Sequence, residues 1–412
     1  MKLDPKRLER QKQVVRGFWA TGGRGSFLAA TGFGKSLVAI MAIMMFRKRH
    51  PDEPVVICVP SDYLRHQWRE LMKEHKLTEV YVNTVHTLVK RPCRAGLLIL
   101  DEMHSYSSPV FSGIFRSVNY SFVLGMTATL SDDEERDQIL HDRCPIFDEI
   151  SLKECLDNGW VSPFVIYNYG IDLNPDDRIY YDEITGKFNR YMATFGFSLK
   201  EMYACLGDLL YRKRYARGIK GMTPEKLVVY AVQANNAMQE RKGFLYNHED
   251  IADHAVRIIN RHGKGKKIIT FSQTSAFCEM LTSRLGTRSN SYHTNLTPQI
   301  IGGKKYSGKK LKTRIMESFI EGEIDVLNTA KALDQGVDIP DIDMSLVCSG
   351  SSSVRQSIQR TGRNIRMKEG KRAVEINLYL RDTQSEKWLR KRQRKHPRST
   401  IKYIFDINEI TP

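Results

Sequence analysis

A glycine-rich stretch between an apolar run and a long helical pattern is the feature that most constrains the fold of this chain. Ser26–Ala30 is apolar enough for a buried strand, Thr31–Ser36 reads Thr-Gly-Phe-Gly-Lys-Ser, and Leu37–Phe46 is a continuous apolar run. A strand that turns through glycines into a helix is the context of a phosphate-binding loop, because the helix N-terminus attracts anions. The sequence therefore predicts an α/β domain with a nucleotide site where the long helix begins.

The residue types in this loop indicate separate tasks. Gly32 and Gly34 allow the backbone to turn and to direct N–H groups at phosphates, and Thr31 belongs to the same loop. Lys35 is expected to reach the β- and γ-phosphates, and the hydroxyl of Ser36 to bind magnesium. The first glycine of the general motif is absent, with Ala29 in its place.

Two carboxylates predict the other half of the site. Leu97–Leu100 is a buried-strand pattern, and Asp101 and Glu102 follow it directly. Ligands bind at the carboxyl ends of strands in parallel sheets. Asp101 is expected to hold magnesium through its water shell, and Glu102 to orient and deprotonate the attacking water. The alternative is an ordinary Asp-Glu pair that caps the next helix. With the loop, the pair predicts ATP hydrolysis with ATP and Mg²⁺ as cofactors.

Short apolar runs alternate with helical patterns along the chain, which indicates parallel sheets built from βα units. A helical pattern without strand signals covers about 174–262. The fold class is therefore predicted as α/β with two parallel sheets plus a helical insertion. The first sheet adds Val55–Val59 and Phe122–Met126 to the strands above, and the second uses Lys267–Phe271, Asp325–Asn328, Met344–Cys348 and Val374–Leu378.

Further motifs carry a resemblance to the superfamily 2 helicases, in that family's order. They are Leu64–Trp68 (LRHQW), Asp101–His104 (DEMH), Gly125–Leu130 (GMTATL), Asn328–Pro340 and Gln359–Arg366 (QRTGRNIR). Within that superfamily the chain resembles the XPB-like DNA translocases, whose relatives include phage branch-migration helicases and restriction-enzyme motor subunits. Met103 departs from the usual Ala or Cys of the second motif, and no room is left for an N-terminal recognition domain.

The resemblance implies two tandem RecA-like P-loop domains. We expect the first lobe at 1–150, the second at 151–385 with the helical segment inside it, and a basic C-terminal tail at 386–412. It also implies that His104, Thr127 and Thr129 couple the ATP site to nucleic acid. Gln13 is expected to read adenine, although Gln11 is an equally defensible choice.

The arginines of the last motif have a chemical rationale of their own. Arg363 and Arg366 are three residues apart, so they share a helix face and can stabilise charge on the γ-phosphate. Because the loop lies in the other lobe, hydrolysis is predicted to require closure of the two lobes. The resemblance adds Gln359 as a catalytic residue, and Gly336, Asp338 and Arg360 as nucleotide contacts.

A basic composition indicates a polyanionic partner. The chain has 64 Lys and Arg against 47 acidic residues, a formal net charge of +17. Lys304, Lys305, Lys309 and Lys310 crowd one glycine-rich segment and are expected, with Thr84, to contact nucleic acid; the alternative is a merely solvated surface. DNA is the preferred partner because the third motif reads Thr-Ala-Thr, and RNA is the alternative.

The predicted function is an ATP-dependent DNA helicase or translocase that unwinds, branch-migrates or anneals DNA in replication, recombination or repair. The alternatives are a motor subunit that needs a protein partner for specificity, an RNA helicase, and a non-moving clamp. Seven scattered cysteines without a C-x-x-C pair predict an intracellular protein, in the cytoplasm of a bacterial or phage-infected cell. No apolar stretch is long enough for a membrane span.

Overall fold

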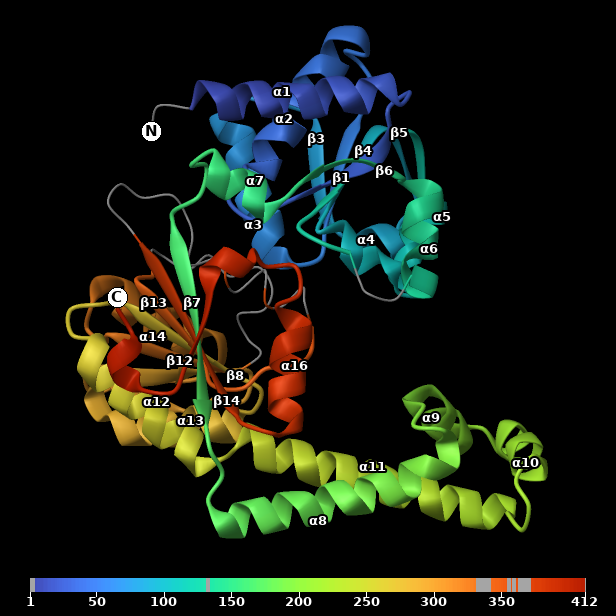
Figure 1. Cartoon of the computed structure of the whole chain (residues 1–412). Helices are drawn as coiled ribbons and strands as arrows, with labels where there is room; N and C mark the ends of the chain where they lie inside the picture. Colours follow the sequence, from blue (N-terminus) through green and yellow to red (C-terminus); the bar gives the residue numbers. More distant parts are fainter. Residues whose placement is uncertain are drawn as a thin grey trace.

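Two parallel sheets, each covered by helices, form the two lobes of the protein, and a long helical arm projects from the second (Figure 1). The computed structural model describes residues 4–130, 134–330, 342–353, 357, 361 and 372–411. The expected architecture of two α/β lobes with a helical insertion is confirmed.

The first lobe is built on six parallel strands in the order β3-β2-β4-β5-β1-β6. Its strands are β1 Arg24–Ala29, β2 Val55–Val59, β3 Val80–Thr84, β4 Cys93–Asp101, β5 Val118–Thr127 and β6 Ile146–Ile150. Its helices are α1 Pro5–Ala20, α2 Lys35–Arg49, α3 Asp62–Glu74, α4 Val85–Lys90, α5 Ile114–Ser117, α6 Glu134–Arg143 and α7 Leu152–Asp157.

Alternation along the strands explains why this sheet is covered on both faces. Phe27 of β1 and Ile57 of β2 belong to one buried cluster, with α1 and α2, whereas their neighbours Leu28 and Cys58 belong to another. Since successive side chains of a strand point to opposite faces, a strand buried on both sides must be apolar throughout. That is the reason why continuous apolar runs, rather than alternating ones, mark these strands.

The second lobe has seven parallel strands in the order β15-β7-β14-β13-β8-β12-β9. They are β7 Phe164–Ile171, β8 Ile268–Ser272, β9 Ser289–Tyr292, β12 Val326–Ala330, β13 Met344–Val347, β14 Ala373–Leu380 and β15 Ile401–Ile404. An antiparallel hairpin lies apart from the sheet, and its strands are β10 Gln299–Ile301 and β11 Lys304–Tyr306. The helices are α12 Glu249–His262, α13 Ser275–Leu285, α14 Gly308–Glu321 and α16 Gln384–Arg392.

The arm consists of α8 Pro175–Met192, α9 Leu199–Gly207, α10 Leu209–Arg217 and α11 Pro224–Tyr246. Asn174 and Thr223 cap the two long helices, α8 and α11, with their side chains, and a proline follows each cap. Figure 1 shows α8 and α11 running side by side away from the second lobe, with α9 and α10 at their far end. Met192, Phe195 and Leu227 help to give the arm tip a small core of its own.

Two boundaries differ from the sequence-based expectation. The segment 386–412 is not a tail, because β15 pairs with β7 and α16 packs on β14 within the second lobe. Its many basic residues concealed the buried Leu389, Arg392 and Ile404. In the helical segment, α12 belongs to the core of the second lobe rather than to the arm. Among the described helices, none combines the length and apolarity that a membrane crossing requires.

Candidate nucleotide and nucleic-acid site

The phosphate-binding loop lies between β1 and α2, as predicted. Gly32 and Gly34 have φ values of 95° and 94°, in the left-handed region. A Cβ on Gly34 would lie 2.6 Å from Nε2 of Gln11, and one on Gly32 would lie 3.0 Å from Val161, so both positions require glycine. Lys35 begins α2, and its Nζ donates a hydrogen bond to the carbonyl of Ala29 at 3.0 Å. Thr31 and Ser36 are half-buried on either side of this turn.

Side chains of helix α1 donate hydrogen bonds to backbone carbonyls of the loop. The sequence analysis identified only part of these residues. Gln11 is buried, and its Nε2 donates to the carbonyl of Phe33 at 2.7 Å. Arg7 donates to the carbonyls of Phe33 and Gly32. Gln13 is exposed, because two residues along a helix turn the side chain to the far side. The structure therefore places Gln11, and not Gln13, against the loop, and it adds Arg7, which the sequence analysis missed.

We expect Gln11→Ala to raise the KM for ATP and to reduce the preference for ATP over GTP. The reason is that Oε1 of Gln11 is buried without a hydrogen-bond partner, which leaves one acceptor for the adenine amino group. Gln13→Ala is the matched control and should leave both quantities unchanged. If Gln11→Ala and Gln13→Ala had the same KM for ATP and the same preference for ATP over GTP, the assignment of Gln11 to adenine would be contradicted.

The two carboxylates lie at the carboxyl end of β4, on the same sheet edge as the loop. Asp101 is buried; its Oδ1 accepts from the backbone N–H of Glu102 at 2.9 Å, and its Oδ2 accepts from Nε1 of Trp68 at 2.8 Å. Burial, and next the Glu102 carboxylate, raise the pKa of Asp101, while Lys35 acts in the opposite direction. Glu102 has a left-handed φ of 49°, which turns the chain sharply after the strand.

These residues fit MgATP on observations of this structure. Oε2 of Glu102 is buried without a hydrogen-bond partner, as expected of a group that awaits a water molecule. The glycine cradle leaves no room for a Cβ, and a helix N-terminus faces it. Ser36 and Asp101 are the hydroxyl and carboxylate oxygen donors that Mg²⁺ prefers.

The predicted coupling residues are in contact with one another. Nδ1 of His104 lies 2.8 Å from Oγ1 of Thr127, and this hydroxyl donates to the carbonyl of Thr129 at 3.1 Å. The same ring nitrogen lies 3.4 Å from Oε2 of Glu102. A continuous path therefore joins the predicted catalytic carboxylate to the end of β5.

Met103, the unusual residue of the second motif, has a packing partner in the third. A Cβ on Gly125 would lie 2.3 Å from Sδ of Met103, so the glycine makes the space that the methionine fills. Both residues are buried. The absence of a side chain at Gly125 thus accommodates Met103.

The predicted residues of the second lobe are only partly placed. Gln359, Arg360, Arg363, Arg366, Gly336 and Asp338 lie outside the described residues. Thr361, between two of these arginines, is buried and donates to Oε2 of Glu375 at 2.6 Å. Its Oγ1 also lies 3.2 Å from Nε2 of His396, a buried residue whose pKa is lowered by desolvation. The C-terminal segment thus contacts Thr361 through His396.

The proposed nucleic-acid contacts divide into two groups. Lys304 and Lys305 are exposed on the β10–β11 hairpin, and Lys309 and Lys310 are exposed at the start of α14. All four therefore lie close together along the chain at exposed positions, and Nζ of Lys304 lies 5.8 Å from the centre of the Tyr306 ring. Thr84, in contrast, is buried, and its hydroxyl lies 3.1 Å from that of Thr87, so the structure argues against a contact with a strand.

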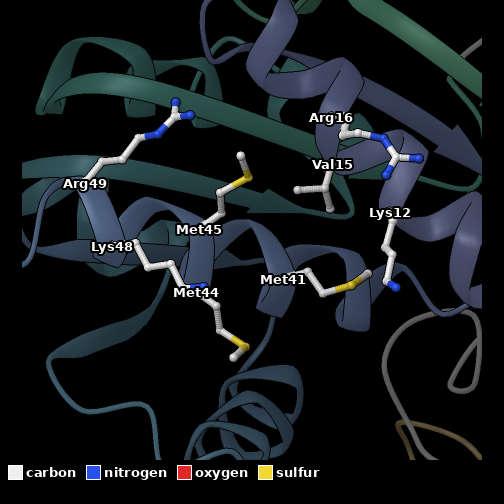
Figure 2. A pocket seen from close by; sticks show the side chains of 8 residues that line it. All are labelled: Lys12, Val15, Arg16, Met41, Met44, Met45, Lys48 and Arg49. Atoms are coloured by element: carbon white, nitrogen blue, oxygen red, sulfur yellow. The ribbon is translucent and has the colours of Figure 1, made fainter.

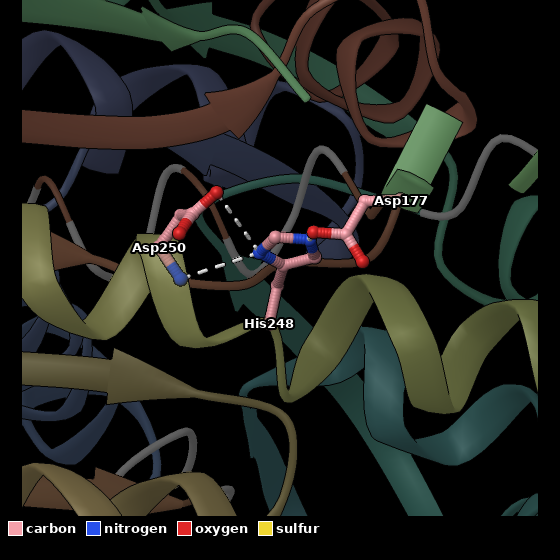
Figure 3. Close-up of side chains that lie close together, drawn as sticks. All are labelled: Asp177, His248 and Asp250. Carbon is pink, nitrogen blue, oxygen red and sulfur yellow. Dashed lines mark hydrogen bonds and ion pairs between the residues drawn. The ribbon is translucent and has the colours of Figure 1, made fainter. Parts of the chain in front are cut away.

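A cluster of three polar residues joins the root of the arm to the second lobe (Figure 3). Nε2 of His248, between α11 and α12, lies 3.3 Å from Oδ2 of Asp177 on α8. Nδ1 of His248 accepts from the backbone N–H of Asp250, so that His248 caps the N-terminus of α12. The cluster therefore fixes where the arm leaves the lobe, away from the nucleotide loop.

A basic, methionine-rich groove runs between α1 and α2 on the outer side of the first lobe (Figure 2). Its volume is about 510 Å³, and Met44 at its edge is 50% exposed. The groove lies along the later turns of α2, away from Lys35, and it is lined by Lys12, Val15, Arg16, Met41, Met44, Met45, Lys48 and Arg49.

Two family models match the chain, one in each lobe. Residues 2–132 match the res subunit of type III restriction enzymes, and residues 250–368 match the helicase conserved C-terminal domain. A helicase domain from Pyrococcus furiosus, Hef, has the same fold, with a TM-score of 0.54 and 14% identity over 92% of this chain and 96% of that one. Two parallel α/β lobes, a phosphate-binding loop and an Asp-Glu pair in this order define a superfamily 2 helicase.

The relatives narrow the class further. A DNA 3'-5' translocase XPB2 from Sulfurisphaera tokodaii is 24% identical over 93% of this chain and 83% of its own length. A putative DNA 3'-5' helicase Rad25 from Haloarcula marismortui is 34% identical, over 90% of this chain and 52% of its own length. A DNA 3'-5' helicase XPB from Kineococcus radiotolerans is 23% identical, with 64% of its length covered. The chain is thus similar to the XPB-like branch of superfamily 2 over most of its length.

Proposed function

We propose that this protein is an ATP-dependent DNA translocase that moves in the 3'-5' direction and remodels DNA strands. The observation that carries the proposal is the nucleotide site of the first lobe, where the loop lysine and the two carboxylates lie at one edge of the sheet. The 3'-5' polarity and the DNA track are proposed from the names of the relatives. The chain spans about half to four-fifths of the length of these relatives, so their full activities are not carried over.

The site supports hydrolysis by a division of labour among residues of this chain. Magnesium bound at Ser36 and Asp101 would neutralise charge on the phosphates. Lys35 and the N-terminal N–H groups of α2 bind and orient the phosphates. Glu102 orients the water and accepts its proton. His104 and Thr127 link this carboxylate to the carboxyl end of β5, so that a change at this end of the strand alters the position of Glu102.

Movement requires the second lobe to take part. We propose that Arg363 and Arg366 complete the site when the lobes close, and that a bound strand favours the closed form. The lysines of the hairpin and of α14 would contact phosphates, which carry no sequence information. A motor of this kind tracks a backbone and leaves recognition to other factors.

A second candidate, a motor subunit of a larger complex, is favoured by exposed apolar surface. The arm tip exposes Phe197 together with Leu209 and Leu210, which begin the basic helix α10, and Leu210 is 77% exposed. The methionine-rich groove is a further partly apolar surface. Scattered exposed apolar residues are ordinary, but a group at one tip is typical of an interaction site.

A substrate panel tests the proposal. ATP turnover should be measured with single-stranded, duplex, forked and junction DNA and with RNA of matched sequence. We expect stimulation by DNA above that by RNA, and strand displacement on substrates with a 3' single-stranded tail. Stimulation by RNA alone would favour the RNA helicase alternative.

Replacement of Lys304, Lys305, Lys309 and Lys310 by Gln should weaken DNA binding and flatten its dependence on salt. Each lost phosphate contact lowers the slope of log K against log salt by about 0.7 on a single strand. The basal ATPase should not change, because none of the four lysines is among the residues assigned to the nucleotide site. The control removes the same charge from exposed lysines of the first lobe, Lys6, Lys12, Lys48 and Lys76. An equal slope in both variants would mean that the cluster is only solvated.

A further inference from the structure

A buried tryptophan holds the predicted magnesium carboxylate from a different element. Trp68 of α3 is 3% exposed, and its indole N–H donates to Oδ2 of Asp101 at 2.8 Å. The two residues are 33 positions apart, on a helix that follows β2 and at the end of the neighbouring strand β4. The contact is therefore tertiary and depends on where α3 lies.

The hydrogen bond is not explained by a general need to satisfy buried indole groups in this protein. Nε1 of Trp19 and Nε1 of Trp160 are buried without a hydrogen-bond partner. An ionised carboxylate, in contrast, is very costly to bury unless donors surround it. The hydrogen bond from Trp68 is therefore better explained by the need to stabilise the buried carboxylate of Asp101 than by the need to satisfy the indole N–H.

The bond also fixes the direction of the carboxylate. The terminal torsion of aspartate is broad and roughly two-fold, so packing alone does not set it. With Oδ1 on the N–H of Glu102 and Oδ2 on Trp68, the plane of the Asp101 carboxylate is defined from two sides. Each oxygen keeps a further lone pair for a magnesium-bound water.

Helix α3 connects this point to the other lobe. Its first turn carries Tyr63, and the pKa of Tyr292 of β9, in the other lobe, is raised by burial and next by Tyr63. Figure 1 shows α3 on the side of the first lobe that faces the second. A shift of the second lobe against α3 can thus reach Asp101 through one side chain.

We propose that Trp68 is a positioning residue for magnesium, which holds Asp101 and transmits the position of α3 to the nucleotide site. The inference rests on the proposed function, since it assumes that Asp101 serves MgATP. Outer-sphere partners of metal ligands are worth about 10–100-fold in metal affinity or activity. Trp68 is expected to lie in that range.

The test compares Trp68→Phe, which keeps an aromatic ring but removes the N–H, with Trp160→Phe as the matched control. At saturating ATP and DNA, the free Mg²⁺ needed for half-maximal ATPase should rise by roughly 10-fold in Trp68→Phe. Excess Mg²⁺ should restore much of the rate. The melting temperature and the affinity for ADP in EDTA should match those of Trp160→Phe.

A loss of activity that Mg²⁺ does not relieve, together with a lower melting temperature, would assign Trp68 a structural role and overturn the proposal. So would equal Mg²⁺ dependence in the two variants. If the wild-type chain shows no DNA-stimulated ATPase, the proposed function itself fails. Failure of the proposed function appears in the wild-type chain, whereas failure of the Trp68 proposal appears only in the comparison of the two variants, so the two can be distinguished.

A measurement on the wild-type chain keeps the proposal testable even if Trp68→Phe does not fold. The indole N–H resonances of the tryptophans can be assigned with Phe variants of Trp19, Trp160 and Trp388. Addition of Mg²⁺ to the ADP-bound protein should move the Trp68 indole resonance and leave that of Trp160 in place. An unmoved Trp68 resonance at saturating Mg²⁺ would show that Asp101 and its tryptophan do not respond to the metal.

Discussion

Glu102→Gln is expected to bind MgATP with nearly wild-type affinity and to hydrolyse it at least ~100-fold more slowly, since a general base contributes ~10²–10⁴-fold. The amide keeps the size of the side chain but cannot accept the proton of the attacking water. Oε2 of Glu102 has no hydrogen-bond partner in the structure, and its contact with Nδ1 of His104 is a longer one of 3.4 Å, so we expect the substitution to leave the fold intact. Single-turnover hydrolysis and fluorescent-nucleotide binding separate the two quantities.

The matched control is Glu70→Gln, an equivalent change at an exposed residue of α3. It should leave both rate and affinity unchanged. If Glu102→Gln slowed hydrolysis less than about tenfold, below the usual contribution of a general base, another group would have to be the base. Stronger DNA binding by Glu102→Gln with ATP present would agree with a closed, DNA-bound state that persists because its ATP is not hydrolysed.

Lys35→Ala is expected to lower ATP turnover by ~10²-fold or more, because the ammonium group stabilises charge that develops on the phosphates. The fold should remain intact. In the structure Nζ of Lys35 donates a hydrogen bond to the carbonyl of Ala29, and the net loss of one such bond costs about 0.5–1.5 kcal/mol. Melting temperature and circular dichroism would establish this.

Lys48→Ala, at the other end of α2, removes the same charge from an exposed position and should retain activity. Turnover by Lys35→Ala close to that of Lys48→Ala would contradict the assignment of the phosphate-binding loop. The pair therefore distinguishes a specific phosphate contact from a general effect of charge on this helix.

The central strands of both sheets were predictable because each is apolar on both faces. Ser26–Ala30, Val55–Val59 and Lys267–Phe271 correspond within a residue or two to β1, β2 and β8. Peripheral strands were missed since their composition is mixed: β15 reads Ile-Lys-Tyr-Ile and exposes two of its four residues. A run of cations before it suggested a tail, although Arg392 and His396 of that run are buried in polar contacts.

The nucleotide site was predictable to the extent that it is local in sequence. Gly32, Lys35, Asp101 and Glu102 follow their strands directly, so the topology of a parallel sheet brings them to one edge. Contacts from distant elements were not predictable. The choice between Gln11 and Gln13 depended on which face of α1 packs on the loop, and the bond from Trp68 to Asp101 depends on how α3 lies over β4.

The length dependence of DNA-stimulated ATPase tests most directly whether this protein is a motor. Turnover by the wild-type chain should be measured at saturating ATP with single strands of increasing length, each at saturating concentration. The proposed mechanism predicts stimulation that rises with strand length to a plateau, because a translocating enzyme hydrolyses ATP at each step before it reaches an end. A rate that DNA does not stimulate, or that is the same on the shortest strand that binds and on long ones, would contradict translocation and favour a clamp that hydrolyses ATP without moving.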